Sequence, residues 1–117
     1  MLFNLGIKAS LGELKLLGYV IGDSDMITGF RLVGIEGAEA NSAEEAHQAL
    51  SKALLRNDLA IIIISEDFSA HSRVREEIDQ VRRDRRNPLI VELPGSKGKP
   101  SGIRMSDLMS KTLGIRL

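Results

Sequence analysis

An uninterrupted apolar run spans Leu59–Ile64 and ends in four consecutive isoleucines. Branching at Cβ stiffens a side chain and suits the pleated surface of a sheet, so this run predicts a strand rather than a helix. Continuous hydrophobicity, without alternation, indicates that both faces of the strand are covered. Such strands are typical of parallel sheets that lie between helices. We therefore interpret this run as the central strand of a small α/β domain.

A short helix is expected between a first strand at 16–21 and a weak second strand at 38–41. The turn residues Gly22–Asp25 precede this helix, and Ser24 or Asp25 is predicted to cap it. Gly34 and Gly37 are predicted to mark its end. Its apolar residues recur at helical spacing: Met26, Ile27, Phe30 and Val33.

The next helix carries a strong start signal. Ser42 is the predicted N-cap, and Glu45 follows three residues later, which predicts a reciprocal capping box. Its apolar stripe consists of Ala46, Leu50, Ala53 and Leu54. The opposite face is charged, as expected for a helix packed on a sheet.

After Ser65–Asp67 the chain is predicted to form one further helix, which ends in the arginine-rich stretch Arg82–Arg86. Asn87 and Pro88 stop it, because a residue before proline is disfavoured in helical conformation. Its narrow apolar face consists of Phe68, Val74, Ile78 and Val81. A fourth strand is expected at Leu89–Leu93.

The pattern predicts an α/β fold with a four-stranded parallel sheet in the order 2-1-3-4, resembling a truncated receiver domain. Right-handed crossover connections favour this order. The predicted organisation is an N-terminal extension (1–15), an α/β domain (16–93), a flexible Gly/Pro loop (94–102) and a C-terminal helical tail (103–117).

Composition narrows the function classes. With 16 basic and 16 acidic residues, the chain has no net field that favours nucleic acid or an anionic membrane surface. The absence of cysteine excludes disulfides, thiolate metal sites and a cysteine nucleophile. No apolar run approaches the ~20 residues that span a bilayer. We expect a soluble cytoplasmic protein without a cofactor.

Few residues suggest chemistry. The loop 94–102 contains glycines and lysines but does not match a phosphate-binding P-loop, so a connector is favoured. Asp23, Asp25 and Asp67 follow strands one and three, where a receiver domain holds magnesium. The simpler interpretation, which we favour, is that these acids cap helices and solvate turns. No catalytic constellation stands out.

Two regions suggest contacts with partners. The Arg82–Arg86 cluster is interpreted as a solvated helix end or a docking patch for an acidic protein. The tail carries apolar residues that a monomer rarely exposes, so it either folds back on the sheet or docks on a partner helix. These residues are Met105, Leu108, Met109 and Leu113.

The order and spacing of several blocks resemble the F subunit of the A-type and V-type rotary ATPases. The resemblance covers about residues 17–100. The blocks are Val20–Asp23, Thr28–Ile35, Glu44–Ala46, Ile63–Glu66 and Pro88–Gly95. In the opening blocks, the residues of the family motif are Gly22, Asp23, Thr28, Gly29, Phe30 and Gly34.

The resemblance implies a non-catalytic component of the central stalk, which turns with the rotor. Members bind the coiled-coil D subunit inside the catalytic A/B hexamer and help couple ATP synthesis or hydrolysis to proton or sodium transport. They reach the cytoplasmic face of the membrane only through this complex, without nucleic acid. Gly29 is expected to permit close packing of its helix, and Phe30 to lie in the core. Arg31 and the four apolar tail residues are the candidate contacts with partners.

The alternative hypothesis is a degenerate receiver-like signalling domain that accepts a phosphoryl group on Asp67 or Asp23.

Overall fold

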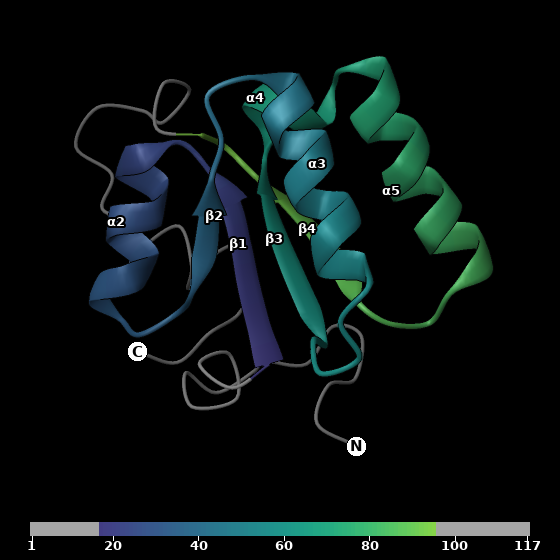
Figure 1. Cartoon of the computed structure of the whole chain (residues 1–117), viewed down its shortest axis with the longest axis horizontal. Helices are drawn as coiled ribbons and strands as arrows, with labels where there is room; N and C mark the ends of the chain where they lie inside the picture. Colours follow the sequence, from purple (N-terminus) through teal and green to yellow (C-terminus); the bar gives the residue numbers. More distant parts are fainter. Residues whose placement is uncertain (1–16, 96–117) are drawn as a thin grey trace.

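A four-stranded parallel sheet lies between helices in the computed structural model, which describes residues 17–95 (Figure 1). The observed order, β2-β1-β3-β4, confirms the predicted fold class and strand order. In chain order the elements are β1 (Gly18–Gly22), α2 (Ser24–Leu32), β2 (Gly37–Glu39), α3 (Ala43–Leu54), β3 (Ile61–Ser65), α4 (Glu66–Ser69), α5 (Ser72–Asp84) and β4 (Leu89–Leu93).

Strand β3 is the central strand because both of its faces are covered. It pairs with β1 on one side and with β4 on the other. Its four isoleucines are at most 5% exposed, and they alternate between two clusters of buried side chains. Ile62 and Ile64 belong to the cluster formed with α3, α4 and α5, whereas Ile61 and Ile63 belong to the cluster formed with α2. The continuous apolar run therefore does supply both faces, as predicted.

The start of α2 differs from the prediction. Asp23, not Ser24 or Asp25, is the N-cap, and its carboxylate accepts a hydrogen bond from the Met26 N–H at 3.0 Å. Strand β1 ends at Gly22 and α2 begins at Ser24, so Asp23 is the extended residue that directly precedes the helix. Its side chain therefore reaches the free N–H groups of the first turn.

The end of α2 is partly as predicted. Gly34 has a φ of 87°, in the left-handed region that glycine adopts without strain, and its N–H donates to the Arg31 carbonyl at 2.9 Å. Gly37, by contrast, does not end the helix but begins β2 opposite Val20. The second strand also ends earlier than predicted, at Glu39 rather than Asn41.

The start of α3 is fixed by two hydrogen bonds to side chains. The Ser42 hydroxyl accepts a hydrogen bond from the Glu45 N–H at 3.2 Å, which confirms the predicted N-cap. The predicted reciprocal bond is wrong in one respect. The Glu45 carboxylate accepts from the N–H of Asn41 at 2.9 Å rather than from Ser42.

The stretch after β3 forms two helices, so the prediction of one helix is wrong. Ser65 caps the four-residue helix α4, and its hydroxyl accepts from the Asp67 N–H at 3.1 Å. His71 has extended backbone and starts α5 anew. The spacing from Phe68 to Val74 does not place both residues on one face of a continuous helix, and the break allows each of them to reach the core.

The last strand, β4, has the predicted bounds Leu89–Leu93. The predicted extension (1–15), the tail (103–117) and most of the loop 94–102 lie outside the described residues.

Candidate functional site

The first two motif residues build the junction between β1 and α2. A Cβ atom at Gly22 would lie 2.6 Å from the sulfur of Met26 and 3.1 Å from its Cβ, so the absence of a side chain lets α2 approach the strand. Asp23 then caps the helix through its bond to the Met26 N–H. Phe30 is fully buried in the α2 cluster. These three motif residues therefore support packing of α2 on the sheet.

The remaining motif residues lie farther along α2 and its exit. Thr28 is exposed and Gly29 is partly exposed, and Gly34 provides the left-handed turn. The expectation that Gly29 permits close packing stays a prediction.

An exposed pair at the end of α2 is the candidate docking surface within the described residues. Arg31 is exposed in the last turn, and its guanidinium forms no ion pair or side-chain hydrogen bond with any other residue of 17–95. The next residue, Leu32, is 83% exposed. An exposed leucine beside such an arginine suits a protein contact, because apolar burial and a charged hydrogen bond are then available together. Sequence reasoning selected Arg31 but missed Leu32.

The other predicted contact residues belong to the tail. Met105, Leu108, Met109 and Leu113 lie outside the described residues, so their role stays a prediction.

The carboxylates that suggested a magnesium site have structural surroundings. Asp23 caps α2, and Asp67 lies in the first turn of α4. The Asp67 carboxylate lies against the backbone of Gly95, just after β4, so a Cβ atom there would collide with it. Within residues 17–95, no three histidine, cysteine, aspartate or glutamate side chains gather closely enough to hold a metal ion.

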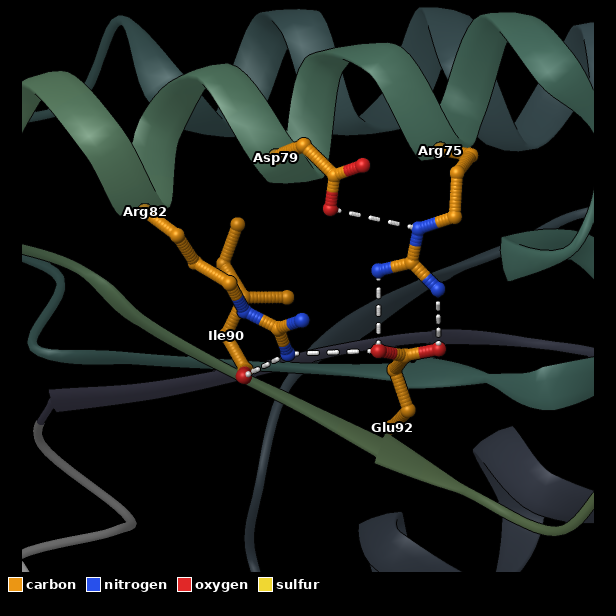
Figure 2. Close-up of polar contacts among 5 residues, drawn as sticks. All are labelled: Arg75, Asp79, Arg82, Ile90 and Glu92. Atoms are coloured by element: carbon orange, nitrogen blue, oxygen red, sulfur yellow. Dashed lines mark hydrogen bonds and ion pairs between the residues drawn. The ribbon is translucent and has the colours of Figure 1, made fainter.

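A polar cluster that the sequence did not single out joins α5 to β4. The guanidinium of Arg75 donates two parallel hydrogen bonds to Glu92, at 2.9 and 3.0 Å (Figure 2). Such bidentate pairs are stronger than single neutral hydrogen bonds. Asp79 lies one turn farther along α5, and its carboxylate is 3.4 Å from the Arg75 Nε atom. That contact is an ion pair only, because the buried Nε atom has no hydrogen-bond partner.

Arg82 completes the cluster from the next turn of α5. Its Nη2 atom donates to the backbone carbonyl of Ile90 at 2.9 Å and lies 3.2 Å from the Glu92 carboxylate (Figure 2). Two arginines therefore face two carboxylates, those of Glu92 and Asp79, and the charges balance. The cluster binds α5 to the strand at the edge of the described sheet.

The charges of this cluster shift the titration of Glu92. Hydrogen bonds from Arg75 lower the pKa of Glu92 from 4.5 to about 2, although burial acts in the opposite direction. A hydrogen bond from Ser69 and the positive charges of Arg75 and Arg82 contribute to the same lowering of the pKa. The side chain of Glu92 is only 21% exposed, so solvent screens these interactions less than at an open surface.

The arginine-rich end of α5 makes specific contacts and is not simply a solvated helix end. Arg82 belongs to the cluster, and Arg85 donates to the carbonyl of Leu54 at 3.3 Å, which helps satisfy the end of α3. Arg83 and Arg86 are exposed, and their guanidinium groups form no hydrogen bond or ion pair with the rest of residues 17–95. Only these two remain as the predicted patch for an acidic partner.

The sequence does contain a signal for the cluster. Arg75, Asp79 and Arg82 recur at helical spacing on α5, and Glu92 is the one charged residue in an otherwise apolar strand. A charged stripe on a helix together with one acid in a neighbouring strand indicates pairing between them. That signal identifies candidates, but not which arginine reaches the strand backbone.

A groove of about 480 Å³ between α3 and α5 is a second exposed feature. Leu54 and Val81 line it, and Leu55, which is 83% exposed, lies at the end of α3 beside it.

In the portion of the chain that the structure describes, no helix is long and apolar enough to cross a bilayer.

Comparison with known proteins relates the chain to one family. Residues 19–111 match the family described as ATP synthase (F/14-kDa) subunit. The F subunit of the A-type ATP synthase of Methanothermobacter thermautotrophicus is 32% identical over 102 residues, which cover 84% of this chain and 92% of that protein. The F subunit of the V-type ATP synthase of Thermus thermophilus is 32% identical over 100 residues, with 82% and 94% covered.

A solved structure agrees with the fold. The crystal structure of the F subunit of the V-type ATP synthase from Archaeoglobus fulgidus is similar, with a TM-score of 0.55 and 30% sequence identity. The similarity covers 67% of this chain and 96% of that chain.

Proposed function

Because the chain belongs to the family of F subunits of A-type and V-type ATP synthases, we propose that it is a non-catalytic rotor component of such a complex. In this role it binds the coiled-coil D subunit and turns within the catalytic A/B hexamer. It thereby helps couple ATP synthesis or hydrolysis to proton or sodium transport at the cytoplasmic face of the membrane. The family match over residues 19–111 is the observation that carries the proposal.

The geometry suggests how the chain contributes. The candidate docking surface of Arg31 and Leu32 lies on α2, which is fixed to the sheet by Phe30 and by the close approach at Gly22. A contact built on a fixed helix requires little ordering of the backbone when a partner binds. We infer that this surface meets the partner coiled coil, together with the apolar residues of the tail.

The experiment is affinity purification from detergent-solubilised membranes of the native cell, with the full chain tagged at its N-terminus. We expect catalytic ATPase components and a long coiled-coil protein to co-purify. Recovery of neither would contradict the proposed function. In that case the receiver-like alternative predicts magnesium-dependent phosphorylation that is lost in Asp67→Asn or Asp23→Asn.

Three point variants and one truncation locate the interface. Arg31→Glu reverses an exposed charge and is expected to reduce recovery of the coiled-coil protein. Arg73→Glu makes the same change at another exposed arginine, at the start of α5, and serves as the matched control. Truncation after Gly102 tests the tail separately. If only Leu55→Ala reduces recovery, the interface lies at the groove between α3 and α5.

A further inference from the structure

Strand β4 is the edge of the described sheet, and its backbone groups point alternately toward β3 and away from it. The Leu89 N–H donates to the Ala60 carbonyl of the chain entering β3 at 2.8 Å. In a parallel ladder the N–H and C=O of one residue point to the same neighbour. The peptide groups of Leu89, Val91 and Leu93 therefore face β3. Those of Ile90 and Glu92 face outward.

Outward peptide groups on an edge strand are a template for another strand. On β4 one of them is already occupied, because the Ile90 carbonyl accepts the hydrogen bond from Arg82 Nη2 at 2.9 Å (Figure 2). The same nitrogen is held 3.2 Å from Glu92, whose carboxylate is fixed by Arg75. The guanidinium is thus anchored at the position that the N–H of an added strand would occupy.

The strand is suited to pairing with its own copy. In an antiparallel pair related by a two-fold axis at Val91, the outward peptide groups of Ile90 would face those of Glu92 in the second copy. That arrangement requires the Ile90 carbonyl to accept from the Glu92 N–H of the other copy. Leu89 begins the strand and is 38% exposed, which adds an apolar contact at the same edge.

We propose that Arg82 prevents the edge of β4 from pairing with a second copy of this chain. The Arg82 guanidinium does so by donating a hydrogen bond to the Ile90 carbonyl, while Glu92 balances the charge of the guanidinium. Removal of the guanidinium frees this acceptor for the N–H of an antiparallel partner strand.

The test compares Arg82→Ala with Arg83→Ala by sedimentation equilibrium over a wide range of protein concentrations. Both variants lose one positive charge from α5, but the Arg83 guanidinium makes no hydrogen bond or ion pair with other described residues. The symmetric pair uses the Ile90 carbonyl of both copies, so freeing these two acceptors is expected to strengthen self-association of Arg82→Ala about thirtyfold relative to wild type. Arg83→Ala is expected to match wild type.

Amide hydrogen exchange identifies the surface involved. In a dimer paired through β4, the Ile90 and Glu92 N–H groups become protected as concentration rises. An unchanged association constant for Arg82→Ala, an equal change in Arg83→Ala, or association without this protection would each overturn the proposal. If Arg82→Ala does not fold, Arg82→Met keeps an unbranched stem over α5 without a donor and is measured in the same way.

Discussion

The two faces of the sheet are held by different forces. On one face, α3, α4 and α5 pack a broad apolar cluster, and the ion-paired cluster of Arg75, Arg82 and Glu92 binds α5 to β4. On the other face, α2 packs through Met26 and Phe30, and the contacts are apolar. One face of the sheet therefore depends on a charged carboxylate shared by two arginines, whereas the other depends on apolar packing.

The asymmetry follows from the strand order. The chain moves from β1 to β2 in one direction across the sheet and then returns over β1 to β3 and β4 in the other. Right-handed crossovers place the connecting helices on opposite faces when the direction reverses. Helix α2 therefore lies on one face, and α3 and α5 share the other (Figure 1).

The largest loss of stability is expected from a change on the face covered by α2. Phe30→Ala removes a fully buried ring and is expected to lower the free energy of unfolding by about 3–5 kcal/mol. Denaturant unfolding followed by circular dichroism measures this change. Thr28→Ala, on an exposed turn of the same helix, is the control. A loss below about 1 kcal/mol in Phe30→Ala would show that α2 contributes little to the core.

The next largest loss of stability is expected when the cluster of Arg75, Arg82 and Glu92 on the other face is disrupted. Glu92→Gln keeps the side-chain shape but leaves Arg75 and Arg82 without their shared carboxylate. We expect denaturant unfolding to show a loss of about 2–3 kcal/mol at neutral pH. Glu76→Gln, an exposed position on α5, is the control and is expected to change stability by less than about 0.5 kcal/mol.

The pH dependence of stability distinguishes the polar cluster from the apolar packing of α2. The pKa of Glu92 is lowered from 4.5 to about 2 in the folded protein, so the unfolded chain binds more protons within this range. The stabilisation by Glu92 is therefore complete above about pH 4.5 and is lost as the pH falls toward 2. Glu92→Gln should flatten this part of the stability curve, whereas Phe30→Ala should lower the curve and keep its slope. Equal slopes in wild type and Glu92→Gln would refute the assignment.

A smaller effect tests the close approach of α2 to β1. Gly22→Ala places a Cβ atom against Met26, and we expect a loss of about 1–2 kcal/mol because the methionine side chain is flexible and partly adapts. In a double-mutant cycle with Met26→Ala, the two losses should not add, since the second change removes the obstacle. Strict additivity would contradict the contact.

The smallest losses of stability are expected from removing one helix N-cap on each face of the sheet. Asp23→Ala removes the N-cap of α2, and Ser42→Ala removes the N-cap of α3. Each is expected to cost about 1 kcal/mol in thermal or denaturant unfolding. Retention of the full stability in both variants would show that solvent replaces the caps without loss.

Much of the fold was predictable because it depends on local pattern. The isoleucines of β3 were recognised as buried on both faces, and Ser42 and the bounds of β4 were predicted correctly from neighbouring residues. The break between α4 and α5 was missed. The spacing from Phe68 to Val74 does not fit one face of a single helix, but the place where the chain bends depends on how both segments pack on the sheet.

The candidate site was predictable only in part. The motif led to Arg31, but the exposure of Leu32 depends on how α2 is rotated against the sheet. The reach of Arg82 to the Ile90 carbonyl likewise depends on the separation of α5 and β4.

Most of the elements and the family could be predicted from the amino-acid sequence because apolar periodicity, caps and motif spacing are properties of short stretches of chain. The strand order followed from these elements and the handedness of their crossovers. The tertiary structure was needed to show which charges neutralise one another and which apolar residues stay exposed. Those outcomes depend on distances between elements that are remote in sequence, and hydrogen bonds and ion pairs form only when such distances fall within a few tenths of an ångström of their optimum.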